Sequence, residues 1–288
     1  MLRRLGTALA VMAVAAMIGA AHAQVMNILF LSKSSGFEHG VIQRDNDEPS
    51  LVERVLSELA ETYGAGITNT KDASYITAEN LENYDVVIFY TTGDLLTEGT
   101  DGHPPMTEEG KEALLEWVEN GGGFIGYHAA TDTFRVGEEG PPDPFIEMLG
   151  AEFEWHGPNF TGTVRVTDPV HPAVNRIPRE WEVYDEWYVF RHINRDNIRV
   201  LAVLDPPEDE RAERPRYDTP ELPIIWVSSH GDGRVYYNAM GHVDEVWEDN
   251  TFQLSIVDAV TWASGQGPAR TTPNYYDVID VEDGEDEE

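Results

Sequence analysis

The sequence predicts an α/β protein built around a doubly wound, mostly parallel sheet, with extra β elements in its second half. Residues 25–31 and 84–90 are nearly continuous apolar runs, as expected for strands that are buried on both faces of a parallel sheet. Residues 107–120 form the clearest amphipathic helix. With the segments between them, these runs give the order strand, helix, strand, strand, helix, strand, which is typical of a doubly wound sheet.

The remaining elements of the first half carry weaker signals. Apolar residues at helical spacing predict a helix over residues 49–63, and a short strand is expected at 67–69. Thr107 is a suitable N-cap for the clearest helix, and the glycines at 121–123 end it. A strand follows directly around residues 124–125, so the first half ends on a central strand.

The second half predicts more β structure than helix. Alternating or apolar segments indicate strands, and the glycines at 231–233 indicate the turn of a hairpin between the last two of them. A short helix and a closing helix are expected at residues 144–149 and 251–263. The expected strands cover residues 151–155, 163–167, 198–204, 222–228 and 234–238.

Composition limits the kinds of partner and chemistry. The 288 residues carry a formal net charge of -34, which argues against nucleic acid or an anionic membrane, because both attract basic surfaces. The chain contains no cysteine, which excludes disulfides, thiolate catalysis and cysteine-ligated metals. A hydrophobic content of 41% is sufficient for a large core.

The two ends of the chain differ from the rest. Residues 1–23 have a charged start, an apolar stretch and a small-x-small ending at Ala21-His22-Ala23, so they are expected to be a signal peptide cleaved near Ala23-Gln24. An uncleaved anchor is the alternative. The protein is therefore expected to be periplasmic or secreted, and free of the membrane after cleavage. Residues 24–265 are expected to form one domain, and residues 266–288 an acidic, disordered tail.

Histidines recur where predicted strands end. His39, His128, His156 and His242 each follow such a strand, with glycine or alanine beside them. Because strand ends share one rim in a doubly wound sheet, we expect these side chains to converge. Imidazole at such a place can ligate a metal, transfer protons or bind sugar hydroxyls. The four histidines are candidate ligands for a divalent metal such as zinc, and His39, His128 and His242 are candidate catalytic residues.

Two groups of acidic residues are candidates for the same site. Asp132 lies four residues after His128, so on a helix it could orient the imidazole, although a helix cap is an equal alternative. Asp185 and Glu186 lie in the aromatic segment 181–188. Aromatic rings stack on the apolar faces of sugars while carboxylates hold hydroxyls, so this segment suits sugar binding. The alternative is a packed aromatic core whose acids point to solvent.

These patterns lead to a definite set of site residues. We expect Glu186 to act in catalysis together with the histidines. His171 lies in a turn-like context and is expected to be structural, and no pattern supports a role for the remaining histidines. No HExxH, P-loop or G-x-S-x-G motif occurs. The expected substrate-binding residues are Tyr127, Asp132, His156, Asp185 and Tyr188.

At these residues the chain resembles the ThuA-like family, named for trehalose utilisation. The resemblance extends in order from about residue 26 to 263, and its motifs are specific only in combination. One departure is Glu38, because the family commonly has arginine before the first histidine. The matching segments are Ser35-Gly-Phe-Glu-His39, Gly122-Gly-Phe-Ile-Gly-Tyr-His-Ala-Ala-Thr-Asp132, Phe153-Glu-Trp-His-Gly157, His171-Pro172, Tyr184-Asp-Glu-Trp-Tyr188 and Gly233-Arg-Val-Tyr-Tyr-Asn-Ala-Met-Gly-His242.

The resemblance implies a fold similar to the class I glutamine amidotransferases, which is flavodoxin-like. In that superfamily a nucleophilic cysteine lies on the tight turn after a central strand, whereas the comparable turn here carries Tyr127-His128-Ala129. Amidotransferase and thiol-protease activities are therefore not expected. The resemblance implies instead a role in sugar metabolism, including disaccharides and their 3-keto derivatives.

The leading hypothesis is an exported carbohydrate-active enzyme that hydrolyses, eliminates or isomerises a glycoside or oxidised sugar. One histidine or Glu186 would act as general base, while the others bind a metal or sugar hydroxyls. A second hypothesis is a non-catalytic sugar-binding or scaffolding module, in which loss of Trp155 or Trp187 would matter more than loss of a histidine. A third is a structural metal site.

Overall fold

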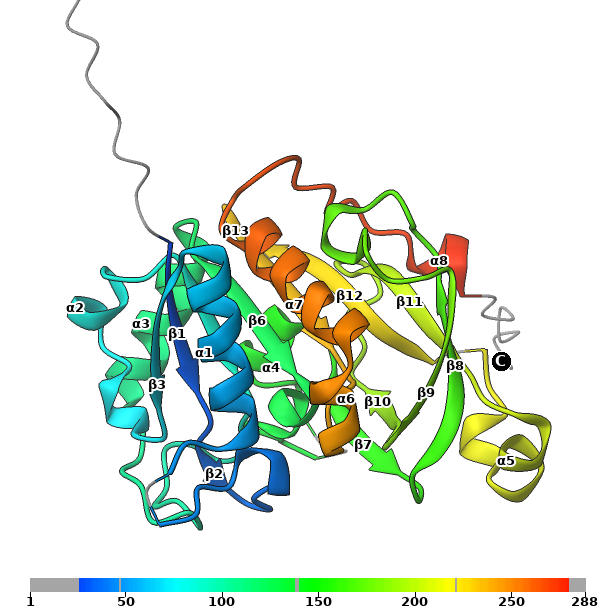
Figure 1. Ribbon diagram of the computed structural model, residues 1–288, viewed down its shortest axis with the longest axis horizontal. Coiled ribbons are helices and arrows are strands. Elements are labelled where there is room, and N and C mark those ends of the chain that lie inside the picture. Colours follow the sequence, from blue (N-terminus) through cyan, green and yellow to red (C-terminus); the bar gives the residue numbers. More distant parts are fainter. Residues whose placement is uncertain (1–25, 47, 138–139, 221, 280–288) are drawn as a thin grey trace, which may run out of the picture.

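A nine-stranded sheet runs through the centre of the molecule (Figure 1). This computed structural model describes residues 26–46, 48–137, 140–220 and 222–279. The strand order is β3-β1-β4-β6-β13-β12-β11-β8-β9. The strands are β1 (Asn27–Leu31), β3 (Gly66–Thr70), β4 (Val86–Phe89), β6 (Gly123–Tyr127), β8 (Phe160–Val166), β9 (Glu180–Asp185), β11 (Arg199–Asp205), β12 (Pro223–His230) and β13 (Gly233–Asn238).

The sheet changes character at β13. The strands from β3 to β13 are parallel neighbours, whereas β12, β11, β8 and β9 extend the sheet through antiparallel pairs. The predicted α/β fold with extra β structure in the second half is therefore confirmed, and the antiparallel part of the sheet is large. Two small sheets pair β2 (Ser34–Ser35) with β5 (Thr92–Gly93) and β7 (Glu152–His156) with β10 (Tyr188–Arg191).

Helices cover both faces of the parallel part of the sheet. In Figure 1, α1 (Leu51–Tyr63) and α7 (Asn250–Ala263) lie in front of the sheet, and α3 (Glu108–Glu119) and α4 (Pro144–Leu149) lie behind it. Within the described ranges, no helix is both long enough and apolar enough to span a membrane. The shorter helices are α2 (Ala78–Leu81), α5 (Glu208–Glu213), α6 (Asp244–Glu248) and α8 (Tyr275–Val278).

Local sequence signals determine where α1 and α3 begin and end. Ser50 accepts the backbone N–H of Glu53, and the Glu53 carboxylate accepts the backbone N–H of Ser50, which completes a capping box. Gly64 ends α1 with a φ of 72°, a left-handed conformation that glycine adopts without strain. Thr107 caps α3 by accepting the N–H of Gly110. Both predicted helices are confirmed.

The hairpin formed by β12 and β13 brings two site-bearing strand ends together. Its register runs from Ile225 opposite Asn238 to His230 opposite Gly233, as the glycine turn predicts. The returning strand β13 then pairs in parallel with β6, with Asn238 opposite Tyr127. The segments that follow β6 and β13 therefore leave the sheet at the same edge, where ligands bind in open α/β sheets.

The prediction of a disordered tail is wrong for residues 266–279. Tyr275 and Ile279 are buried, and the side-chain amide of Asn274 bonds both the N–H and the carbonyl of Val200, at 2.7 and 3.0 Å. This amide thus bonds the backbone of β11 in the manner of a neighbouring strand. The segment is ordered because its few apolar and amide side chains find partners on the domain, which an acidic composition does not reveal.

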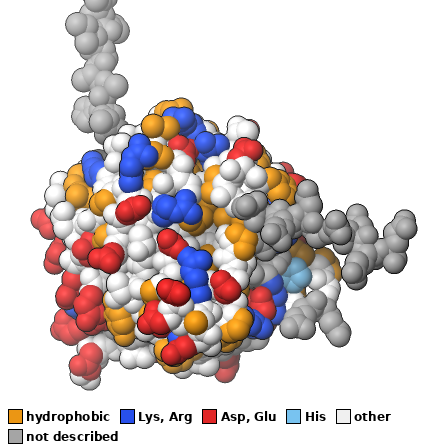
Figure 2. All heavy atoms as spheres, turned by 90° about the vertical axis from the view of Figure 1, so that its right-hand side faces the viewer, with side chains coloured by type: hydrophobic (Ala, Val, Ile, Leu, Met, Phe, Trp, Pro, Cys, Tyr) orange, Lys and Arg blue, Asp and Glu red, His pale blue; other side chains and the backbone are white. Residues whose placement is uncertain are grey.

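Acidic residues occur across the face of the molecule that Figure 2 shows. Figure 2 shows Asp and Glu side chains scattered over one face, with Lys and Arg side chains among them. The expected signal peptide, residues 1–23, and the last part of the expected tail, residues 280–288, lie outside the described residues.

Candidate functional site

Five polar side chains from distant parts of the chain meet near the carboxyl ends of the parallel strands. His128 directly follows β6, His242 lies four residues after β13, and His39 follows β2. Glu186 occupies the corner between β9 and β10, and His156 is the last residue of β7. The structure thus brings together all four histidines that the sequence places after strands.

His128 combines a strained backbone with a fixed tautomer. Its φ of 42° lies in the left-handed region, which residues other than glycine seldom adopt and which is enriched at functional sites. Its Nδ1 lies 2.7 Å from the carbonyl oxygen of Ala239, which can only accept, so Nδ1 carries the hydrogen. In the neutral imidazole, Nε2 then presents its lone pair, 3.5 Å from Oε2 of Glu186.

Glu186 is the anionic centre of the cluster. Its Oε2 lies 3.3 Å from Nδ1 of His242, and its Oε1 lies 2.9 Å from Nδ1 of His156. Burial by itself raises the pKa of the Glu186 carboxyl, but its contacts with the three histidines, His128 first among them, outweigh burial and hold the pKa well below its ordinary value. Glu186 is therefore ionised and can hold a cation or receive a proton.

His39 closes the cluster on the side of β1. Its ring centroid lies 5.0 Å from that of His128 and 5.2 Å from that of His242. Burial, reinforced by these two histidines, lowers the pKa of His39 to about 2, so the imidazole is neutral near pH 7. Its Nδ1 is buried without a hydrogen-bond partner among the described residues. Such an unpaired nitrogen is costly, and a bound group that reached it would remove that cost.

His156 lies at the rim rather than inside the cluster. Its Nδ1 donates to the carbonyl of Gly157 and to Oε1 of Glu186, each at 2.9 Å. The hydrogen bond to Glu186 raises the pKa of His156 above its ordinary value, and 43% of the side chain is exposed. This imidazole is placed to carry a proton and to exchange it with solvent.

The inner residues have the size and chemistry of a metal site. Three of the ligand atoms, Nε2 of His128, Nδ1 of His242 and Oε2 of Glu186, are separated by 3.3, 3.3 and 3.5 Å. Ligands at about 2.1 Å from a tetrahedral ion are about 3.4 Å apart, so this triangle fits zinc or a similar ion. Four residues each offer a ligand atom that lies within 4.8 Å of the other three: His39, His128, Glu186 and His242. The remaining expected metal ligand, His156, is not among them.

A pocket of about 380 Å³ opens at the cluster. This volume suits a small ligand. The rings of Phe37, Phe153 and Tyr188 line the pocket beside the histidines, and Asp132 adds a second carboxylate. Ring faces next to carboxylates and imidazoles can bind the apolar and the polar groups of a sugar at the same time.

Asp132 lines the pocket but does not orient His128, contrary to one of the two sequence interpretations. Its carboxylate accepts a hydrogen bond from Arg135 at 2.7 Å, whereas the backbone carbonyl of Ala239 holds the imidazole. The segment His128–Asp132 is a 3₁₀ helix with about three residues per turn, so positions four apart do not share a face as they would on an α-helix. Burial raises the pKa of Asp132.

Asp185 holds the loop that carries His242 and does not reach the pocket, so its predicted role in substrate binding is wrong. The carboxylate is fully buried and accepts the backbone N–H groups of Gly241, His242 and Val243, at 2.7, 3.0 and 3.3 Å. Burial raises the pKa of Asp185, although the nearby His128 and the backbone N–H groups of Gly241 and Glu186 oppose the shift. The role of Asp185 is to place His242.

The predicted substrate contact by Tyr127 is also wrong. Its ring is fully buried and packs against Tyr236, Trp247 and Phe252. The strand ends at Tyr127, and the left-handed backbone of His128 turns the chain into the 3₁₀ helix that follows. Tyr188, by contrast, lines the pocket and packs against His128 with 4.3 Å between ring centroids.

The two tryptophans that the sequence suggests for sugar affinity lie elsewhere. Trp187 is buried, and its indole N–H donates to the carbonyl of Phe160. Trp155 packs against Tyr217, outside the pocket lining. Besides the predicted Tyr188, the pocket aromatics are Phe37 and Phe153, which sequence reasoning missed. Each lies two or three residues before a site histidine, and that proximity is the one signal that could have identified them.

His171 is remote from the cluster and gives a prediction of its own. Its Nδ1 accepts the N–H of Ala173, and burial lowers the pKa of His171 to about 4. The unfolded chain takes up this proton near pH 6.5, before the folded protein does. The contribution of His171 to stability is therefore complete above pH 6.5 and is lost as the pH falls towards 4, by at most about 1.4 kcal/mol per pH unit.

Replacing His171 with asparagine should flatten this part of the pH profile. Asparagine keeps a side-chain acceptor for the cap at Ala173 but has no proton to bind. In urea unfolding at pH 7 and pH 5, His171→Asn should lose less stability than wild type on acidification. Equal losses in the two proteins would contradict the assignment.

The other three histidines, His103, His192 and His230, do not belong to the cluster or the pocket lining.

Solved structures share this architecture. A ThuA-like protein from Bacteroides uniformis is 22% identical, with a TM-score of 0.62, and the match covers 90% of this chain and 99% of that one. A ThuA-like protein from Parabacteroides merdae is 19% identical with a TM-score of 0.61, over 88% and 96% of the two chains. A cytoplasmic protein from Salmonella typhimurium is 14% identical with a TM-score of 0.53, over 82% and 98%. At these identities the likeness establishes the fold.

Family membership follows from the sequence profile. Among curated proteins, none matches the chain significantly. The profile of the ThuA family, described as trehalose utilisation, matches residues 27–263 and so spans the whole sheet and every residue of the histidine cluster. This protein belongs to the ThuA family, whose description points to a role in carbohydrate metabolism.

Proposed function

We propose that the protein is an exported enzyme that acts on a glycoside or a keto sugar, by hydrolysis, elimination or isomerisation. The observation that carries this proposal is the convergence of the buried His39 and His128, the partly exposed His242 and an ionised Glu186 in a pocket with aromatic walls. The trehalose-utilisation family supports a carbohydrate substrate, and the signal-like N-terminus supports export. The left-handed turn at His128 supports kinship with the class I glutamine amidotransferases, because it occupies the turn after a central strand.

The geometry suggests a division of labour among the residues. His39, His128, His242 and Glu186 would hold a divalent metal, which when bound would supply a Lewis acid for a sugar hydroxyl or carbonyl. His156, which is half exposed and hydrogen-bonded to Glu186, would exchange protons between substrate and solvent.

The remaining lining residues would bind the sugar. Asp132 would bind a hydroxyl, or accept its proton, because burial raises the pKa of this carboxyl. Phe37 and Phe153 would contact the apolar faces of the ring.

The test combines metal analysis with a substrate screen. The purified protein should contain, or take up, about one divalent ion per chain, and it should turn over at least one member of a panel of glycosides and 3-keto-glycosides. His128→Ala and His242→Ala should remove turnover by lowering kcat. His230→Ala is the matched control, because this histidine lies outside the cluster and the pocket lining.

A non-catalytic sugar-binding module is the second candidate, and the aromatic lining is the observation that favours it. It predicts sugar affinity by calorimetry without turnover. It also predicts that affinity falls more for Phe153→Ala than for His242→Ala. If the two histidine variants fold and process sugars as the wild type does, the proposed active site is wrong.

A further inference from the structure

His39 differs from the other clustered histidines in how its ring is held. The carbonyl of Ala239 fixes His128, and Asp185 fixes the backbone of His242. The His39 imidazole has no such partner: its Nδ1 is unpaired within the described residues, and its ring has only edge contacts, with Phe37, Tyr90, His128 and His242. No hydrogen bond holds this ring, so its position depends on packing and on the backbone that precedes it.

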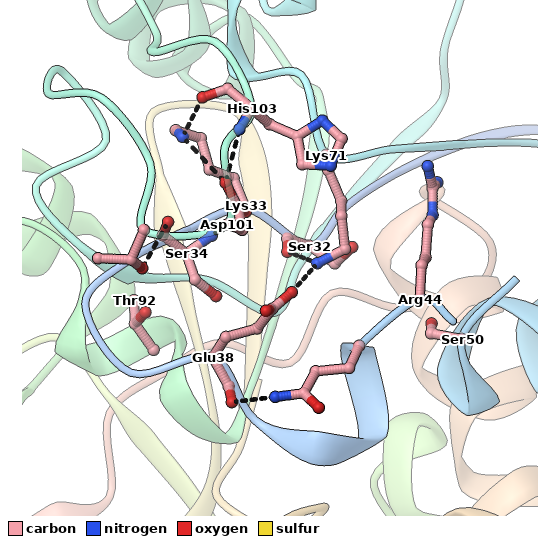
Figure 3. Close-up of polar contacts among 12 residues, drawn as sticks. Ser32, Lys33, Ser34, Glu38, Arg44, Ser50, Lys71, Thr92, Asp101 and His103 are labelled. Carbon is pink, nitrogen blue, oxygen red and sulfur yellow. Dashed lines mark hydrogen bonds and ion pairs between the residues drawn. The ribbon is translucent and has the colours of Figure 1, made fainter. Parts of the chain in front are cut away.

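Hydrogen bonds from the segment after β4 hold the backbone of residues 34–37, which precedes His39. Thr92 donates to the carbonyl of Phe37 at 2.9 Å, and Thr100 donates to the carbonyl of Gly36 at 2.6 Å. The Asp101 carboxylate accepts the N–H of Ser34 at 2.7 Å. Figure 3 shows Thr92 and Asp101 beside the segment from Ser32 to Glu38. They fix the path of the chain up to Phe37.

A buried lysine holds the residue that comes next. Lys71, at the end of β3, is 2% exposed, and its Nζ donates to the carbonyl of Ser32 at 3.1 Å and to Oε1 of Glu38 at 2.7 Å. In Figure 3 its ammonium lies between these two oxygens. Glu38 directly precedes His39. The side chain of Lys71 thus connects the end of β1 to Glu38, the residue directly before His39.

We propose that Lys71, acting through Glu38, is the positioning residue for His39. The proposal rests on the proposed function, in which His39 is a metal ligand. Removing one partner of a buried ion pair destabilises a protein mainly when the other charge is left buried without a partner. Glu38 keeps 26% of its side chain exposed, so water can solvate it when Lys71 is replaced. The main consequence of breaking the pair is therefore a misplaced ligand and not an unfolded protein.

Replacing Lys71 with methionine tests the proposal. Lys71→Met should weaken Co²⁺ binding, measured by chelator competition, by about 10- to 100-fold, the range typical of lost second-shell partners. Lys71→Arg should restore most of the affinity, because it returns a cation to Glu38. Lys111→Met is the matched control: it breaks the Lys111–Asp143 pair, whose atoms are 2.6 Å apart, outside the pocket lining. Co²⁺ affinity should be unchanged in this control.

A double-mutant cycle separates positioning from a general effect on the fold. In a His39→Ala background, Lys71→Met should have no further effect on Co²⁺ affinity. If it weakens binding by the same factor in both backgrounds, Lys71 acts elsewhere and the proposal is overturned.

A measurement without metal keeps the two proposals distinguishable. The ¹⁵N resonances of the His39 imidazole should shift in Lys71→Met and stay in place in Lys111→Met. Unshifted His39 resonances in Lys71→Met would overturn the positioning role, whatever the metal result. If wild-type protein binds no Co²⁺ while the resonances do shift, the metal part of the proposed function fails and the positioning of His39 by Lys71 stands.

Discussion

Replacing Glu186 with glutamine is expected to remove metal binding and turnover while the protein stays folded. Glutamine keeps the size of the side chain but loses the charge that three histidines surround. Metal affinity should fall by more than about 100-fold, beyond the loss typical of a second-shell change, because a ligand itself is removed. Chelator competition on the purified variant measures this.

The same substitution has a consequence that needs no metal. The hydrogen bond to Glu186 is the largest cause of the raised pKa of His156, so this pKa should fall in Glu186→Gln. Titration followed by NMR measures it. Glu182→Gln is the control, because Glu182 is an exposed carboxylate on the neighbouring strand β9. An unchanged pKa of His156 in Glu186→Gln would show that the two side chains do not interact in solution.

Replacing Asp185 with asparagine is expected to lower the free energy of unfolding by about 3 kcal/mol, through lost hydrogen bonds to a buried charge. The carboxylate accepts three backbone N–H groups from Gly241, His242 and Val243. An amide NH₂ in place of one oxygen would face these donors and could not accept from them. Because the same bonds place His242, metal affinity should fall as well. Urea unfolding and chelator competition measure the two effects.

Asp244→Asn is the matched control for this substitution. Asp244 lies three residues after Gly241, at the start of α6, and is exposed. Its replacement should change stability by less than about 0.5 kcal/mol, as is usual at the surface. A comparably small change in Asp185→Asn would contradict the role assigned to the buried carboxylate.

Much of the fold could be predicted because its elements carry local signals. The capping box at Ser50 and Glu53, the cap at Thr107 and the glycine turn before β13 each depend on residues a few positions apart. The ordering of residues 266–279 could not be predicted in this way. It depends on contacts between Asn274 and Val200, which are far apart in the sequence.

Part of the candidate site was also accessible from sequence. Buried strands that end in histidine predict imidazoles at one rim, and His39, His128 and His242 do lie together there. The partners of these rings were not accessible. The tautomer of His128 depends on a backbone carbonyl at Ala239, and a carbonyl leaves no mark in the sequence because every residue has one.

Adjacent residues in the sequence can have different roles, and two pairs in this protein could not be separated from sequence alone. Asp185 and Glu186 are adjacent acids in one aromatic segment, yet Glu186 faces the histidines and Asp185 faces the backbone of another loop. Tyr127 and His128 separate in the same manner, one into the core and one into the site. In both pairs the strand ends between the two residues, so the turn that follows the strand decides which side chain faces the pocket.

The sequence by itself therefore determined the α/β class, the family and the positions of the histidines, because strand and helix patterns and motifs are local properties. The tertiary structure decided which carboxylate joins the histidines, which one holds a loop, and that Lys71 reaches the residue before His39. Each of these contacts depends on how distant segments cross at the sheet edge, and no pattern within a single segment records that geometry.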